Sequence, residues 1–111
     1  MDLTWHEFER VEMRTGTIIA AEDFAKARKP AYQLTIDFGN EIGIRQSSAQ
    51  ITVLYDKADL IGRQIIAVVN FPKKQIANFF SECLVIGSVD AEGVVTLLQP
   101  ERKVENGLRI G

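Results

Sequence analysis

The segment from Tyr32 to Phe38 places the strongest constraint on how this 111-residue chain can fold. Apolar and polar residues alternate strictly within it, so every apolar side chain falls on one face of an extended strand. The pair Gly39-Asn40 ends this run, and Ile42–Ser48 follows with the character of a returning strand. The segment therefore predicts two antiparallel strands with one buried face.

Other apolar runs, bounded by turn residues, predict further strands. They span residues 11–21, 64–71, 82–89 and 94–98. Gly16, inside the first run, indicates a bulge or a sharp bend. The stretch Ile51–Ile61 is expected to hold a short helix that stops at Gly62. Asn106-Gly107 predicts a final tight turn.

A short helix is predicted at the N-terminus. Thr4 and Glu7 have the spacing of a capping box, in which each residue satisfies a backbone N–H of the other. Trp5, Phe8 and Val11 recur at intervals of three and form a narrow apolar stripe. A helix this short is only marginally stable alone, so its stripe must pack on something. Two alternatives are open: its own chain, or a second copy across a two-fold axis.

Five or six strands, with glycine bends and a helix between the third and fourth strands, are typical of a small Greek-key barrel. We therefore expect an all-β fold: a five-stranded OB-fold barrel, residues 1–111 forming one domain. Short extensions are expected at the N-terminus (1–11) and the C-terminus (100–111). A β-sandwich is the alternative, but it usually needs seven strands and no internal helix.

Charge and composition argue against several classes of protein. The formal net charge of −2 argues against a dedicated, high-affinity nucleic-acid binder, which usually carries a basic excess. The single cysteine, Cys83, lies in an apolar stretch and is expected to be a buried thiol. The longest apolar run, Ile65–Val69, is too short to span a bilayer, and no signal peptide is visible. We therefore expect a cytoplasmic protein without membrane insertion.

No pattern in the chain predicts catalysis. His6 is the only histidine and has no second ligand at metal-binding spacing. Ser47 and Ser48 lack a nearby histidine and a Gly-x-Ser-x-Gly turn, and the glycines do not form a phosphate-binding loop. We expect a protein that is not an enzyme, with no catalytic residue, no metal and no cofactor.

Basic residues gather in two stretches without acids. Residues 24–36 hold Lys26, Arg28 and Lys29, and residues 60–81 include Lys73 and Lys74. In an OB barrel the loops after the first and fourth strands flank the ligand face, so these two stretches are expected near one another. Aromatic residues beside them would stack bases or hold an extended peptide. Alternatively, the aromatic residues fill the barrel and the lysines are merely solvated.

Phe79 and Phe80 are adjacent in a segment of strand-like character. Neighbouring strand residues point to opposite faces, so one of the two rings should be exposed or lie at a subunit interface.

Several blocks, in order, carry a family resemblance. Arg14–Glu22, Arg28–Gly39, Ser47–Gln50 and Asn70–Phe79 resemble the tRNA-binding domain appended to methionyl- and phenylalanyl-tRNA synthetases and present in the EMAP II cytokine. The wording "ARKPAYxLTIDFG", "SSAQIT" and "VVNFPxKQIANFxSE" is similar to the CsaA branch of stand-alone export chaperones. The likeness extends from about Phe8 to Gly111. It implies an OB barrel whose two extensions make a homodimer, and no catalysis.

The CsaA branch further implies binding of unfolded preproteins and of the translocation ATPase SecA. The alternative is a tRNA-binding protein or accessory module. In tRNA-binding members an Arg-Gly pair stands where this chain has Ala77-Asn78, and Pro72-Lys73 inverts their Lys-Pro order. An arginine able to clamp phosphate in a bidentate manner is thus missing, so tRNA binding is expected to be weak.

Two sets of candidate residues follow from the residue patterns and the resemblance together. The first set is expected to bind peptide or tRNA: Lys26, Arg28, Lys29, Tyr32, Arg45, Ser47, Ser48, Gln50, Asn70, Phe71, Lys73, Lys74, Asn78, Phe79 and Ser81. The second set is expected at the dimer interface: Trp5, Phe8, Val104, Leu108 and Ile110.

Overall fold

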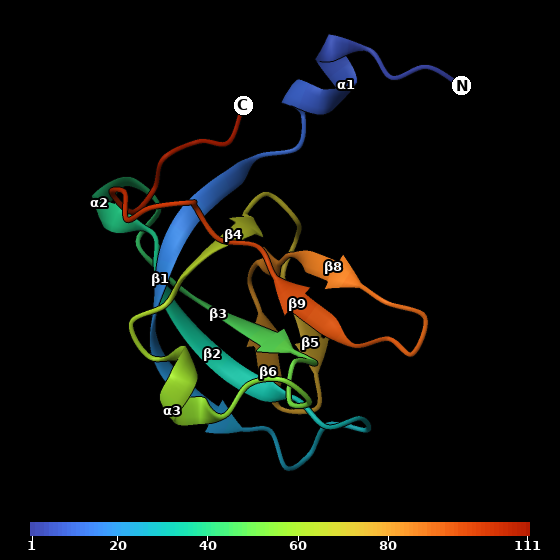
Figure 1. Ribbon diagram of the computed structural model, residues 1–111, viewed down its shortest axis with the longest axis vertical. Coiled ribbons are helices and arrows are strands. Elements are labelled where there is room, and N and C mark those ends of the chain that lie inside the picture. The colour runs from blue at the N-terminus through green and yellow to red at the C-terminus, as the bar shows by residue number, and fades with distance from the viewer.

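The computed structural model covers residues 1–111 and centres on an antiparallel sheet that curves into a barrel (Figure 1). Its five strands follow the order β3-β2-β1-β4-β7. They are β1 (Met13–Asp23), β2 (Tyr32–Asp37), β3 (Ile44–Ala49), β4 (Gln64–Val68) and β7 (Leu84–Val85). The predicted five-stranded OB-fold barrel is confirmed.

Two hairpins and three short helices complete the fold. The hairpins are β5 (Lys74–Ile76) with β6 (Phe79–Ser81), and β8 (Gly87–Val89) with β9 (Val95–Leu97). The helices are α1 (Trp5–Glu9), α2 (Gly39–Ile42) and α3 (Lys57–Leu60). The expected helix between the third and fourth barrel strands is α3, although only four residues of the predicted stretch are helical. None of these helices has the length and apolar character needed to cross a membrane.

The barrel core is built from the alternating strand on which the fold prediction rests. Leu34, Ile36 and Phe38 are completely buried, together with residues such as Ile18 and Ile65 from β1 and β4. Burying these side chains removes apolar surface from water, which is the main favourable contribution to folding.

Gly16 has a different role from the one predicted. The β1 bulge lies between Ile18 and Ala20, not at Gly16. A Cβ on Gly16 would lie 2.7 Å from Cγ2 of Ile36 and 2.8 Å from the ring of Phe38. Glycine is therefore needed because two core side chains approach the β1 backbone closely.

Two other predicted strands differ from the structure. The strand expected from Ile42 begins at Ile44, because residues 39–42 form the helical turn α2 between Gly39 and Gly43, both at positive φ. The expected buried strand 82–89 divides at Ile86 into β7 and β8, and Leu84 and Val89 are exposed. The division arises because the N–H of Ile86 donates to β4 while its carbonyl accepts from the β9 side.

The C-terminal strap, residues 100–111, extends the sheet beside the first part of β1. The N–H of Thr15 donates to Leu108, and the N–H of Ile110 donates to Met13. The predicted turn at 106–107 is confirmed, with Gly107 at a φ of +87°. The strap thus occupies the position beside β1 that β2 occupies farther along the strand.

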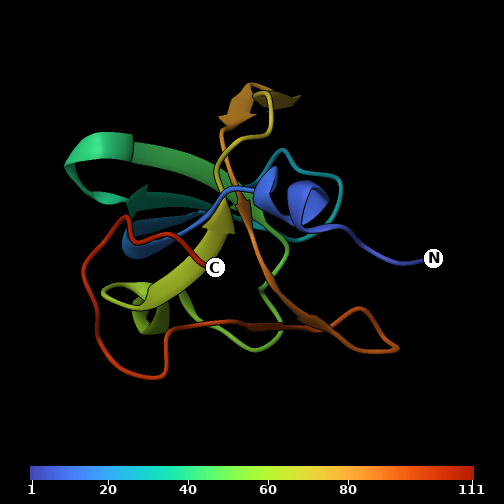
Figure 2. The same ribbon diagram turned by 90° about the horizontal axis from the view of Figure 1, so that it is seen from above.

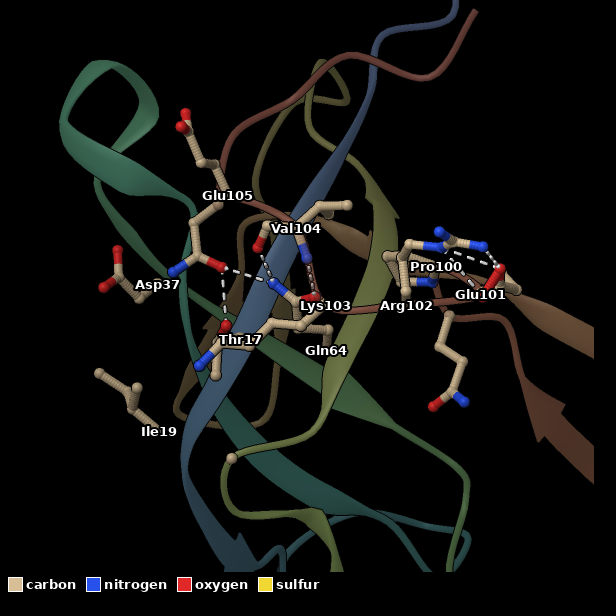
Figure 3. Close-up of a pocket in the computed structure, with 13 residues that line it drawn as sticks. Thr17, Ile19, Asp37, Gln64, Pro100, Glu101, Arg102, Lys103, Val104 and Glu105 are labelled. Carbon is tan, nitrogen blue, oxygen red and sulfur yellow. Dashed lines mark hydrogen bonds and ion pairs between the residues drawn. The ribbon is translucent and has the colours of Figure 1, made fainter.

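Side chains reinforce this attachment (Figure 3). The amide of Gln64 pairs with the backbone of Val104 in both directions, at 2.7 and 3.0 Å. Oδ1 of Asn106 accepts from Oγ1 of Thr17 at 2.7 Å and from Gln64 at 3.3 Å. The side-chain amide of Gln64 therefore makes the two hydrogen bonds with the strap backbone that a neighbouring strand would otherwise make.

Helix α1 projects from the barrel (Figures 1 and 2). The predicted capping box is present: the hydroxyl of Thr4 accepts from the N–H of Glu7, and the carboxylate of Glu7 accepts from the N–H of Thr4. The bonds that the Glu7 carboxylate accepts from the N–H and from the hydroxyl of Thr4 lower the pKa of Glu7. No residue of α1 is buried, and Trp5 is 81% exposed. The apolar stripe of α1 therefore does not pack on its own barrel.

Cys83 is a core thiol, as predicted from its apolar surroundings. Burial raises its pKa to about 12, although nearby Arg45 and a hydrogen bond with Ser47 act in the opposite direction. The thiol therefore stays protonated in the folded protein at neutral pH.

We predict that this thiol makes the folded state lose stability in alkali. Between its ordinary pKa of 9.0 and about 12, the unfolded chain ionises Cys83 while the folded chain keeps the proton. The free energy of unfolding should thus fall as pH rises, by about 2 kcal/mol at pH 10.5 from this group alone. Urea denaturation of the wild type and of Cys83→Ala at pH 7 and 10.5 measures the difference. Equal losses in the two proteins would contradict the prediction.

Candidate binding groove beside the β5–β6 hairpin

The barrel closes between β3 and residues 81–85, where side chains make most of the bonds. One backbone bond crosses this seam, from the N–H of Glu82 to the carbonyl of Gln46 at 2.8 Å. The Glu82 carboxylate accepts from the N–H of Gln46 at 3.0 Å, and the Ser81 hydroxyl accepts from the N–H of Ser48 at 3.2 Å. The two strand edges are therefore joined only over a short distance.

Three adjoining hollows of about 630, 460 and 470 Å³ surround the β5–β6 hairpin at this seam. They share lining residues, so we treat them as one feature, the hairpin groove. Volumes of this size are typical of ligand sites. The groove has an apolar part, formed by Phe71, Pro72, Ile76, Leu84, Val85, Ile86, Val89 and Val95. Phe71, Leu84 and Val89 are exposed within it.

The rim of the groove is predominantly cationic. Arg45, Lys73 and Lys74 contribute three positive charges, against the single carboxylate of Glu82. Nζ of Lys73 lies 3.7 Å from Oε2 of Glu82, and Arg45 donates to the carbonyl of Val69. Lys74 forms no ion pair within the chain. The groove can therefore bury apolar groups while offering a free ammonium to an anion.

An aromatic contact places the loop between β1 and β2 beside the hairpin. The rings of Phe24 and Phe79 lie 5.3 Å apart at an interplanar angle of 60°, and Ala31 packs with them in a second small core. Tilted aromatic pairs of this kind are favourable. Lys26, Arg28 and Lys29, all exposed, stand on this loop. The contact thus joins Phe24 of the first basic stretch to Phe79 of the second.

Eight of the fifteen predicted ligand residues line the hairpin groove: Arg45, Ser48, Gln50, Asn70, Phe71, Lys73, Lys74 and Ser81. The amide of Asn70 is already engaged, since its Oδ1 accepts from Glu12 and its Nδ2 donates to Arg10. Four more predicted residues are exposed outside the groove: Lys26, Arg28 and Lys29 on the loop, and Asn78 at the hairpin tip.

Three predicted ligand residues are buried. Tyr32 lies in the barrel core, where its hydroxyl donates to the carbonyl of Tyr55 at 2.7 Å. Ser47 is fully buried and donates to the carbonyl of Cys83 across the seam at 3.2 Å. Phe79 belongs to the small core. In this conformation none of the three side chains lines the groove or presents a surface to a ligand.

The alternation expected at Phe79 and Phe80 is confirmed, because Phe79 is 8% exposed and Phe80 is 49% exposed. The apolar wall of the groove, with Leu84, Val85 and Val89, is the part that the sequence analysis missed. Those residues have the sequence character of a buried strand, whereas in the structure Leu84 and Val89 are exposed and Val85 is half-buried.

A larger hollow, about 980 Å³, lies between β1 and the C-terminal strap (Figure 3). Its lining is mainly polar and of mixed charge, including an ion pair between Glu101 and Arg102. Hydrogen bonds that attach the strap occupy several of its polar groups. The hairpin groove, which combines apolar surface with unpaired positive charge, is therefore the stronger candidate for binding.

The fold is shared with known structures. The CsaA chaperone of Bacillus anthracis is 50% identical, with a TM-score of 0.94 and full coverage of both chains. The CsaA chaperone protein of Picrophilus torridus is also 50% identical, with a TM-score of 0.92, covering 99% of this chain and 100% of the other.

Sequence comparisons connect the chain to synthetases as well. The methionine–tRNA ligase of Thermococcus onnurineus is 31% identical over 106 residues, which is 96% of this chain. The chain spans only 14% of that ligase. A family described as "Putative tRNA binding domain" matches residues 13–109. The chain therefore belongs to the tRNA-binding domain family, and among the solved structures it is similar over its full length to CsaA chaperones.

Proposed function

We propose that this protein is a chaperone of the CsaA type that holds unfolded polypeptide in the hairpin groove. The observation that carries the proposal is the combination of exposed Phe71, Leu84 and Val89 with the unpaired ammonium of Lys74 in one open groove. Similarity to two CsaA chaperones over the full length supports the same assignment. No bond is made or broken in this function, and no cofactor takes part.

The chemistry of the groove suits flexible chains of varied sequence. An unfolded segment gains about 25 cal/mol for each Å² of apolar surface that it buries against these side chains. Carboxylates of the segment gain from Lys73, Lys74 and Arg45 at the rim. Neither contribution depends on one particular sequence, as a chaperone for many clients requires.

We infer that the protein acts as a homodimer. The stripe of α1, with Trp5 at 81% exposure, has no partner in its own chain, although the C-terminal strap is close: the guanidinium of Arg109 donates to the carbonyl of Glu9 at 2.6 Å. Leu108 on the strap is also exposed. A two-fold interface formed by Trp5, Phe8, Val104, Leu108 and Ile110 would place two grooves on one body. Two linked grooves raise the effective concentration for a long client.

The resemblance to export chaperones adds the partners to this proposal. The clients are unfolded preproteins, SecA is the partner, and the site of action is the cytoplasm. The domain 1–111 supplies the groove, and its two extensions form the interface.

tRNA binding is the second candidate, and the family match favours it. Lys26, Arg28 and Lys29 are exposed beside the hairpin, where the ring of Phe80 is also exposed, and such an arrangement suits phosphates and a stacked base. Ala77-Asn78 at the hairpin tip offers no guanidinium, however, so a bidentate phosphate contact is absent there.

The two candidates differ in their dependence on salt. We predict that the purified protein binds an unfolded secretory precursor with an affinity that changes little between 50 and 200 mM salt, because apolar burial dominates. Binding through two or three phosphates would instead weaken about 10- to 40-fold over the same range. Fluorescence anisotropy with labelled precursor and with bulk tRNA measures both. Submicromolar tRNA binding without precursor binding would overturn the proposal.

Two double charge-reversal variants test whether the precursor binds in the hairpin groove. Lys73→Glu with Lys74→Glu should weaken the precursor complex. Arg102→Glu with Lys103→Glu makes the same charge change at the strap and should leave the complex unaltered, provided that sedimentation shows the variant to have the same oligomeric state as the wild type. Equal effects of the two pairs would contradict binding in the hairpin groove.

The dimer is tested separately. We predict that the double variant Trp5→Ala, Phe8→Ala sediments as a monomer, because the interface loses its largest apolar groups. The matched control, Val53→Ala with Leu54→Ala, removes two exposed apolar side chains elsewhere and should leave the dimer intact. Sedimentation velocity of the three proteins gives the answer, and a dimer that persists without Trp5 and Phe8 removes α1 from the interface.

A further inference from the structure

We propose that an unfolded polypeptide binds in the hairpin groove as an added β-strand, paired with a free strand edge at Val85, Gly87 and Val89. This inference rests on the proposed function, since it states how the same groove holds its polypeptide.

The hydrogen-bond pattern of β7 and β8 leaves this edge free. In antiparallel pairs, alternate residues direct both backbone groups toward the partner strand, and the residues between them direct theirs away. The N–H of Ile86 donates to Ile66 of β4, and its carbonyl accepts from Leu98 next to β9. Asp90, four residues on, donates to Val94.

The even-numbered residues from 84 to 90 therefore direct their backbone N–H and C=O groups toward β4 and β9. These two strands lie on the same side of the segment. Val85, Gly87 and Val89 direct their N–H and C=O groups to the opposite side. No strand of the chain pairs with them there. The three residues line the hollow of about 460 Å³ whose other wall is residues 48–51.

The edge lacks the features that normally discourage pairing with another chain. Exposed edges are usually protected by charged residues, prolines or bulges. Residues 84–89 read Leu-Val-Ile-Gly-Ser-Val and contain neither charge nor proline. A row of unpaired backbone groups above apolar side chains matches an extended peptide, which brings the same groups in the same spacing.

The charges at the two ends of the groove further restrict which peptide sequences fit it. Lys74, without an ion pair, lies toward the hairpin end. The other end runs into the β8–β9 turn with Asp90 and Glu92, and the Asp90 carboxylate is engaged by the N–H groups of Glu92 and Val94. A complementary segment is extended, alternates apolar and polar residues, and carries an acidic residue at one end and a basic residue at the other.

The test uses a labelled peptide of the sequence Glu-Val-Thr-Val-Thr-Val-Thr-Lys and two versions of it, N-methylated at every valine or at every threonine. All three share the same side chains, but each modified peptide has lost one set of alternate N–H donors. Pairing with one edge predicts that one modification lowers affinity at least tenfold and that the other changes it less than threefold. Equal effects of the two modifications would overturn the pairing.

The same titration separates this inference from the proposed function. If the unmodified peptide fails to bind, both the strand-addition inference and the proposed polypeptide binding are wrong. If all three peptides bind alike, polypeptide binding stands and strand addition is wrong.

Amide hydrogen exchange is a second test, in which the residues between the proposed pairing residues serve as the control. In the free protein the amides of Val85, Gly87 and Val89 should exchange rapidly, while those of Ile86 and Ser88 exchange slowly. Saturating unmodified peptide should slow the first three at least tenfold and leave the other two unchanged. Slow exchange of the first three without peptide would show an edge already covered, for example by a second copy, and would overturn the inference, as would unchanged exchange with peptide bound.

Discussion

The closure of the barrel between β3 and residues 81–85 determines most of what this protein can bind. A continuous strand ladder at that position would consume the edge groups of both segments. Instead, Glu82 and Ser81 reach across with their side chains, and one backbone bond completes the seam. Beyond this short join the edges separate, and the hairpin groove lies in the space around them. Because few hydrogen bonds join the two edges at the seam, the barrel keeps a buried core while it exposes an apolar surface beside the seam.

The ring contact between Phe24 and Phe79 is the second element of this arrangement. It connects the loop after β1 to the β5–β6 hairpin, two segments more than fifty positions apart in the sequence. Because of it, the loop that carries Lys26, Arg28 and Lys29 adjoins the hairpin that begins at Lys74. The same contact explains why Phe79 itself is not a ligand residue: its ring holds the hairpin in place while Phe80 points outward.

The sequence predicted those parts of the structure that local patterns determine. The alternation in Tyr32–Phe38 identified β2 and the buried face, and Thr4 with Glu7 identified the start of α1. The sequence did not reveal features that depend on contacts between distant segments. The division of 82–89 at Ile86 arises because β4 and β9 share one strand, and the burial of Ser47 follows from the seam. Composition cannot show either, so the apolar wall of the groove became visible only in the folded chain.

The central claim, that unfolded polypeptide occupies the hairpin groove, is tested most directly by paramagnetic labelling. A nitroxide placed in the middle of a bound unfolded precursor should broaden the NMR signals of residues around the groove, such as Phe71, Lys74 and Leu84, and spare those of the C-terminal strap. Broadening concentrated on the strap or on α1, with the groove signals unaffected, would contradict the account.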